Sequence, residues 1–118
     1  MKFTYIELNS QESAEDDIPG ERIAKLICNA LNGEGPYERG NYGWEWVFRG
    51  NNYKALAVLQ QYDEGWLIPI NVGFMDMILK RGATVLEDLS GGIESALGQE
   101  LEKLQKFQSE QEFHDSGV

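Results

Sequence analysis

Apolar and polar residues alternate through the centre of the chain, and this alternation predicts three consecutive antiparallel strands. Trp44, Trp46 and Phe48 alternate with Glu45, Val47 and Arg49, which is the period of a strand. Turns at 51–52 and 63–64 would join this strand to the next two. The resulting apolar face comprises Trp44, Trp46, Phe48, Ala55, Ala57, Leu59, Trp66, Ile68 and Ile70.

The strand register follows from side-chain size. With these turns Phe48 lies opposite Ala55, so that large and small side chains share the available volume. A three-residue turn with Gly65 as a bulge would instead turn Leu67 inward, and we prefer the first register because it collects more apolar groups on one face. Pro69 has no N–H for the ladder, so we expect the third strand to end there or to lie at an edge.

Helical periodicity flanks this meander. The spacing of Ile23, Ile27 and Leu31 predicts a helix over 18–32, with Asp17 as its N-cap. After the meander, 71–82 favours a short helix and 83–89 a strand or an extended link. A long amphipathic helix is predicted from Ser90 to about residue 111. Its apolar stripe is Ile93, Leu97, Leu101, Leu104 and Phe107.

The remaining segments have less regular patterns. Residues 1–17 favour a short strand (2–8) followed by an acidic lead-in, and 112–118 is expected to be a frayed tail. Residues 33–43 hold four glycines and one proline, which predicts a long loop that is either a connector or functional. The chain is therefore predicted to be one α+β domain over 1–118. Its core would be an antiparallel meander of three to four strands packed against an N-terminal and a long C-terminal helix.

Composition limits the number of domains and the expected cellular compartment. A length of 118 residues with a single cysteine, Cys28, fits one domain without an internal disulfide. No apolar stretch is long enough to span a bilayer, and the N-terminus lacks the features of a secretory signal. We therefore expect a cytoplasmic protein.

Charge is the strongest compositional signal. Ten Lys and Arg against twenty Asp and Glu give a net charge of −10. Residues 1–35 hold three basic and seven acidic groups, residues 83–118 hold two and eight, and residues 36–82 hold five of each. Such a surplus disfavours direct nucleic-acid and anionic-membrane binding and fits a basic protein partner. The alternative is that the charge simply maintains solubility.

Sequence motifs for catalysis are missing. The chain has no P-loop, dinucleotide-binding or nucleophile-elbow motif, and its only histidine, His114, falls in the predicted tail. With one Cys and one His, a clustered zinc or haem site is excluded by counting. A carboxylate pair drawn from Glu45, Asp63 and Glu64 is the remaining possibility for catalysis. We therefore expect no enzyme activity, no metal and no cofactor.

Two surfaces have interpretations that the sequence leaves open. The tryptophans favour core packing, with a stacking platform for ligands as the alternative. The other side of the meander is mixed, and either another part of the chain or a partner would cover it. That side carries Glu45, Val47, Arg49, Lys54, Leu56, Val58, Gln60, Tyr62 and Leu67.

The leading functional hypothesis is a non-catalytic inhibitor or neutraliser. It would block a basic, nucleic-acid-handling protein, such as a nuclease toxin or a defence enzyme, by steric and charge complementarity. The first alternative is an acidic dimeric chaperone or adaptor of the secretion type, and the second is a small-ligand or carbohydrate-binding module. A monomer or a weak homodimer is expected. The candidate contact residues are Tyr37, Arg39, Tyr42, Glu45, Arg49, Tyr62, Asp63 and Glu64.

Overall fold

A computed structural model describes residues 2–9, 20–40, 43–51, 53–72 and 82–118 of the chain. Their radius of gyration and extents, 13.4 Å and 42 × 32 × 29 Å, are those of one small domain. The elements in chain order are β1 (Lys2–Leu8), α1 (Glu21–Ala30), β2 (Glu34–Arg39), β3 (Gly43–Gly50), β4 (Tyr53–Tyr62), β5 (Gly65–Val72), α3 (Gly82–Leu97), the 3-10 turn η1 (Gly98–Glu100), β6 (Leu101–Phe107) and α4 (Glu110–Asp115).

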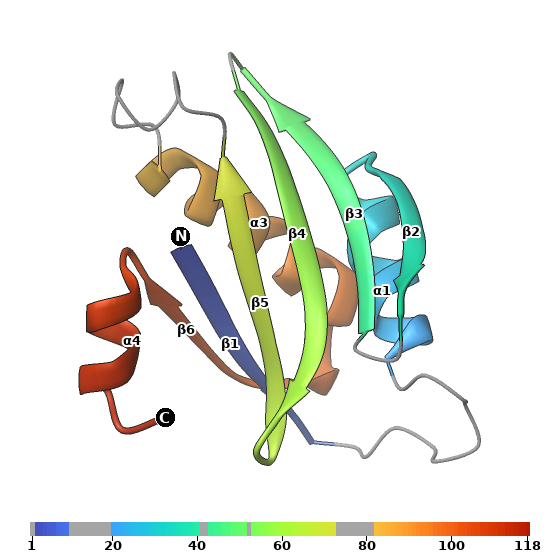
Figure 1. Ribbon diagram of the computed structural model, residues 1–118. Helices are drawn as coiled ribbons and strands as arrows, with labels where there is room; N and C mark the ends of the chain where they lie inside the picture. The colour runs from blue at the N-terminus through green and yellow to red at the C-terminus, as the bar shows by residue number, and fades with distance from the viewer. Residues whose placement is uncertain (1, 10–19, 41–42, 52, 73–81) are drawn as a thin grey trace.

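The fold is α+β, with one six-stranded sheet in which every pairing is antiparallel. The strand order is β2-β3-β4-β5-β1-β6, so the meander β2 to β5 is extended by the two terminal strands. Helices α1 and α3 lie behind the sheet in the view of Figure 1, and α4 lies beside β6 and β1. We call the side under α1 and α3 the helix-covered face and the other side the opposite face. The prediction of three to four strands was therefore too low.

The predicted meander registers are confirmed. Phe48 pairs with Ala55 and Trp46 with Ala57 between β3 and β4, and Ala57 pairs with Ile70 between β4 and β5. All nine residues of the predicted apolar face are buried, none more than 7% exposed. The tryptophans are therefore core, and each large buried side chain contributes about 1.5–3 kcal/mol through removal of apolar surface from water.

Two helices complete the main core. Their buried side chains are Ile23, Ala24, Ile27, Cys28, Val85, Leu86, Leu89, Ile93 and Leu97. Gly92 in α3 lies close to the end of α1, because a Cβ at this position would stand 2.6 Å from Cδ2 of Leu31. A larger residue at this position would therefore require the Leu31 side chain to move. The helix predicted over 18–32 is confirmed as α1 with later bounds, and the predicted N-cap Asp17 lies outside the described residues.

The N-terminal strand predicted at 2–8 is confirmed, but it lies inside the sheet. β1 pairs with β5 on one side and with β6 on the other. The expectation that the third strand ends at Pro69 or lies at an edge was wrong, because β5 continues to Val72 and is paired on both sides. Each residue of an antiparallel strand directs its N–H to one neighbour, so a single proline removes one ladder bond and leaves the adjacent pairs intact.

The loop predicted over 33–43 is wrong in part. Glu34–Arg39 forms the edge strand β2, which pairs with β3 through a register shift between Glu34 and Tyr37. Glycine and proline are typical of loops, but here they occupy an irregular edge strand, where a missing N–H and a shifted register are tolerated.

The predictions for 83–111 were wrong in part. The helix α3 spans Gly82–Leu97, so it confirms the helix expected over 90–97 and replaces the strand or link expected over 83–89. It ends before Gly98, which has φ +51°. The long C-terminal helix is replaced by β6. Leu101 and Leu104 are three residues apart, as on a helix, yet they pair with Leu8 and Ile6 because β6 carries an extra residue at this point. The short helix predicted at 71–82 falls largely outside the described residues.

The C-terminal segment is not a frayed tail. The side chain of Ser109 accepts a hydrogen bond from the backbone N–H of Glu112 and so caps α4. Phe113 is 5% exposed and belongs to a second apolar cluster on the opposite face. This cluster comprises Phe3, Tyr5, Leu67, Phe107 and Phe113.

Two neighbouring residues of β3 test this layering. Trp46→Ala is expected to lower the free energy of unfolding by about 3–5 kcal/mol, because it empties a fully buried site on the helix-covered face. Val47→Ala is the matched control on the opposite face and should cost less than half as much, since Val47 is only half-buried. Urea unfolding measures both, and equal losses would contradict the assignment of faces.

Candidate protein-binding surface

The opposite face of the sheet is divided into two halves. Over β1, β5 and β6 it is covered by α4, whose Phe113 stacks on Phe3 with ring centroids 5.1 Å apart and meets Phe107 edge-on at 5.4 Å. Over β2, β3 and β4 no helix of the described chain lies in front of the strands in Figure 1. The described helices therefore leave this second half of the opposite face uncovered.

We call this second half the open face. Its apolar centre is made of the half-buried Val47 and Leu56, which lie beside the buried Val58. Beside it on the edge strand, Tyr37 is 60% exposed and is the only exposed large hydrophobic side chain in the described residues. An amphipathic ring held on a rigid strand provides a large contact area at low entropic cost.

Ion pairs border the open face. Arg39 Nη1 lies 3.8 Å from Glu45 Oε2, and Arg49 Nη2 lies 3.4 Å from Glu34 Oε1. Lys54 is exposed and stands opposite Arg49 on the neighbouring strand. The open face is therefore close to neutral, although the chain as a whole is strongly acidic.

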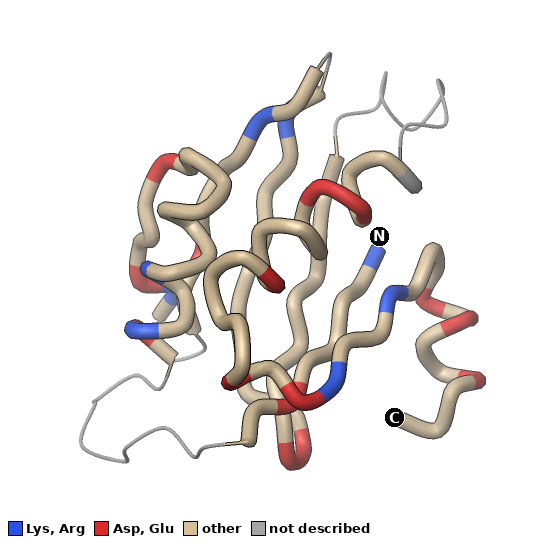
Figure 2. Tube along the Cα trace, turned by 180° about the vertical axis from the view of Figure 1, so that it is seen from behind, with Lys and Arg blue, Asp and Glu red and all other residues tan. Residues whose placement is uncertain are grey.

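The acidic groups gather at one end of the sheet, which we call the acidic end. It consists of the β4–β5 turn with Asp63 and Glu64, the end of β1 with Glu7, and the start of β6 with Glu100 and Glu102. Figure 2 shows several acidic positions of the backbone, in red, gathered at the lower end of the molecule. The positive φ of Asp63, 53°, is tolerated by Asp, and it lets the turn present both carboxylates to solvent.

Only part of the acidic end is neutralised. Glu7 pairs with Lys103 (3.9 Å between Oε2 and Nζ), and Glu100 with Arg22 (3.1 Å between Oε2 and Nη1). Across the parts of the chain that the structure describes, no Lys or Arg forms an ion pair with Asp63, Glu64 or Glu102.

Tyr5 of β1 lies close to the acidic end. Burial, followed by the carboxylates of Glu7 and Asp63, raises the pKa of Tyr5.

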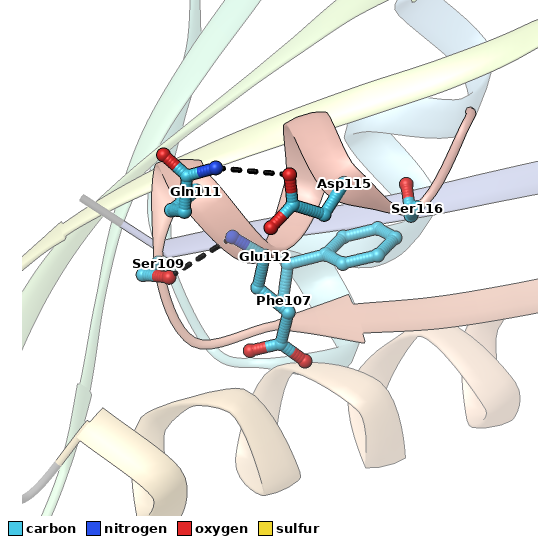
Figure 3. Close-up of a pocket in the computed structure, with 6 residues that line it drawn as sticks. All are labelled: Phe107, Ser109, Gln111, Glu112, Asp115 and Ser116. Atoms are coloured by element: carbon cyan, nitrogen blue, oxygen red, sulfur yellow. Dashed lines mark hydrogen bonds between the residues drawn. The ribbon is translucent and has the colours of Figure 1, made fainter.

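A shallow hollow of about 550 Å³ lies between α4 and the end of β6. Its lining residues are Phe107, Ser109, Gln111, Glu112, Asp115 and Ser116, shown in Figure 3. Both carboxylates are already hydrogen-bonded within the chain: Glu112 accepts from the Gln108 N–H at 3.0 Å and Asp115 from Gln111 Nε2 at 2.9 Å. The hollow extends the acidic surface along α4.

The candidate contact residues fall into two groups. Tyr37, Arg39, Glu45 and Arg49 come together on the open face, because the segment predicted as a loop forms β2 and pairs with β3. The other group lies at the acidic end and contains Asp63 and Glu64.

Two candidates differ from this arrangement. Tyr62 is part of the α4 cluster: its hydroxyl donates to the Val118 carbonyl at 3.0 Å, and its ring meets Phe113 edge-on at 5.4 Å. Its role as a contact residue stays a prediction. Tyr42 lies outside the described residues.

Glu102, Glu112 and Asp115 were not among the candidate contact residues, because Glu102 was expected on a solvated helix face and 112–118 was expected to be a frayed tail. A local signal was present. Ser109 followed three residues later by Glu112 is a capping-box pattern, which predicts a helix start at this point.

Buried reactive groups are few in the described part of the chain. The Tyr53 hydroxyl donates to Asp88 Oδ2 at 2.6 Å, and burial together with this hydrogen bond raises the pKa of Tyr53. Burial also raises the pKa of the Cys28 thiol, which disfavours the reactive thiolate. The described residues contain no group of three or more potential metal ligands. None of their helices combines the length and apolar character required to cross a bilayer.

Comparison of the chain with protein-family models, with curated protein sequences and with solved structures finds no match. The surfaces described above are therefore the basis for a functional proposal.

The buried tyrosine predicts a dependence of stability on alkaline pH. The pKa of Tyr53 is raised in the folded state above the ordinary 10.0, so its stabilising contribution is complete below pH 10 and is lost as the pH rises further. The free energy of unfolding should therefore fall above about pH 10. Tyr53→Phe should make this decline shallower, whereas Tyr37→Phe, at an exposed site, should leave it unchanged. Chemical denaturation over pH 8–11 measures the slopes, and identical slopes for all three proteins would refute the prediction.

Proposed function

We propose that this protein acts by binding a basic protein and that it blocks its partner without catalysis. The partner class favoured by the charge is a protein that handles nucleic acid, such as a nuclease toxin or a defence enzyme, since such proteins carry basic surfaces. The cytoplasm is the expected compartment, where a free, buried thiol such as that of Cys28 is stable.

The observation that carries the proposal is the junction of an acidic end with an open sheet face. β4 runs through both: Leu56 and Val58 belong to the open face, and the strand continues to the Asp63–Glu64 turn. A partner seated on this surface would meet an aromatic and aliphatic centre next to uncompensated carboxylates. Hot spots of protein interfaces have this composition, with an apolar anchor and charge at the rim.

The two parts would contribute differently to binding. Exposed carboxylates attract a basic partner over distances near the Debye length, about 10 Å at 0.1 M salt, and so raise the association rate. Tyr37 and the aliphatic centre would slow dissociation, because they lose water-exposed apolar surface in the complex. The charge on the partner's nucleic-acid site would thus be covered by a folded anionic surface.

One alternative loses its structural basis. A ligand-binding module that stacks its ligand on exposed indoles requires accessible tryptophans, and Trp44, Trp46 and Trp66 are 7%, 0% and 6% exposed.

The first test is recovery of the partner. The protein is immobilised and exposed to lysate of its source cell, and bound proteins are identified by native mass spectrometry. We expect a stoichiometric partner with a basic surface, whose association slows steeply between about 0.1 M and 1 M salt. Failure to recover a stoichiometric basic partner, or an association rate insensitive to salt, would refute the proposal.

The second test assigns the surface with charge-matched variants. Asp63→Asn together with Glu64→Gln should slow association several-fold, since asparagine retains the left-handed turn conformation while removing the charge. Glu21→Gln together with Glu94→Gln removes the same charge from the helix layer and serves as the control.

The anchor is tested separately with Tyr37→Ala. This variant should raise the dissociation constant about tenfold or more with little change in unfolding free energy, because the ring is exposed in the free protein. Equal association rates for the two charge-matched variants, together with unchanged affinity for Tyr37→Ala, would exclude this surface.

A further inference from the structure

We propose that the outer edge of β6 binds the β6 edge of a second copy of this chain, so that two sheets join across a two-fold axis. This inference is independent of the proposed function. It concerns the end of the sheet farthest from β2, and its partner is the protein itself.

The first observation is that β6 is an edge strand with a regular partner on one side only. It is the last strand of the sheet and pairs with β1 from Phe3–Phe107 to Leu8–Leu101. Among the described elements, no strand pairs with its other side. An edge of this kind presents a row of backbone N–H and C=O groups that can accept another strand.

The two edges of the sheet differ in this respect. β2 contains Pro36, which has no N–H, and its ladder with β3 is interrupted by the shift between Glu34 and Tyr37. β6 also carries an extra residue, Glu102, but five consecutive residues beyond it, Lys103–Phe107, pair regularly with β1. β6 is thus the edge better suited to extend the sheet.

The second observation is the self-complementary charge pattern of β6. In an antiparallel pairing centred on Leu104, Glu102 of each copy stands opposite Lys106 of the other, and Lys103 stands opposite Gln105. Opposite charges directly across two strands stabilise the pair. The pairing thus forms two identical ion pairs related by the two-fold axis.

Two of the neighbouring registers are less favourable. Centring the pair on Lys103 places the two copies of that lysine opposite each other, and a shift in the other direction, by half a residue, places Lys103 opposite Lys106. Like charges directly opposite each other destabilise a strand pair. The charge pattern therefore selects the register centred on Leu104 over these two.

The intramolecular contacts of β6 are compatible with this arrangement. Lys106 is held by Glu87 of α3 and Lys103 by Glu7 of β1. The ammonium of Lys106 has three donors, so it can bind Glu87 and Glu102 of the second copy together. Glu102 is exposed and, over the described chain, has no ion-pair partner of its own, so it is free to pair across the axis.

Long-range charge opposes association, because each copy carries a net charge of −10. Salt screens this repulsion over distance while adjacent ion pairs and backbone hydrogen bonds are affected less. We therefore expect a weak dimer that becomes stronger as salt is raised from about 0.05 M to about 0.5 M, the reverse of the dependence expected for a basic partner.

The experiment is sedimentation equilibrium of the full chain and three variants at concentrations up to about 1 mM. Glu102→Lys replaces both attractions by repulsions and should weaken the dimer about tenfold or more. Glu94→Lys, with the same charge change on α3, is the matched control and should leave dimerisation unchanged or strengthen it. The double variant Glu102→Lys/Lys106→Glu restores opposite charges across the axis and should recover the dimer.

Each outcome decides the proposal. A wild-type protein that stays monomeric at about 1 mM in high salt would overturn it. So would equal effects of Glu102→Lys and Glu94→Lys, or failure of the double variant to recover the dimer while thermal unfolding shows it to be folded. Slower amide hydrogen exchange in Leu101–Phe107 as the dimer forms would support the edge pairing, because it reports new backbone hydrogen bonds.

Discussion

The structure depends on packing large side chains of β3 against small ones of β4 beneath two helices. Trp46 opposite Ala57 and Phe48 opposite Ala55 give the sheet surface hollows and ridges that α1 and α3 can cover. A one-residue slip would turn every one of these groups to the opposite face, so the hydrophobic face and the register specify each other. Trp46 even keeps its indole N–H without a hydrogen-bond partner in the described chain, a penalty of about 1–3 kcal/mol that burial of the ring offsets.

This packing also determines what remains at the surface. Since the tryptophans face inward, the opposite face of β3 carries Glu45, Val47 and Arg49. The short helix α4 covers only the end of that face nearest β6, through the aromatic cluster around Phe113. The result is one sheet whose first face is covered by α1 and α3 and whose opposite face is covered only in part by α4. Its two edge strands are the irregular β2 and the more regular β6.

The sequence predicted the local structure best where side-chain alternation and turn chemistry agreed. From Trp44 to Ile70 the strand period and the collection of apolar side chains on one face favoured one register over the alternative with a bulge at Gly65, and the structure has the favoured register. Glu45 and Arg49 could be placed on one face because alternate residues of a strand share a face, whereas Tyr37 and Arg39 could not, since 33–43 was predicted to be a loop. The ion pair between Arg49 and Glu34 at the border of the open face could not be predicted, because Glu34 was not expected to lie on a strand beside β3.

The predictions failed where a tertiary partner decides the conformation. Leu101, Leu104 and Phe107 have helical spacing, and only the pairing with β1 and its extra residue shows them to be a strand. Gly98 was a local stop signal, since its positive φ ends α3. Residues 83–89 contain β-branched residues and an acidic pair without strong helical signals, so packing on the sheet decides their helical state. The acidic end could not be derived from sequence spacing, because its residues (7, 63–64 and 100–102) are far apart in the chain and only the fold brings them together.

The open face and the β6 edge can operate together because they lie at opposite ends of the strand order, and Glu102 is the one residue that the acidic end shares with the dimer contact. β6 is one edge of the sheet and β2 is the other, so joining two copies through β6 leaves both open faces accessible. A dimer would then present two copies of the surface that contains Tyr37 and the β4–β5 turn. Two binding surfaces on one particle raise the apparent affinity for a partner that is itself dimeric, without any new contact, provided that the geometry allows both to be engaged. The salt responses separate the two associations, since screening weakens attraction between unlike surfaces and relieves repulsion between like ones.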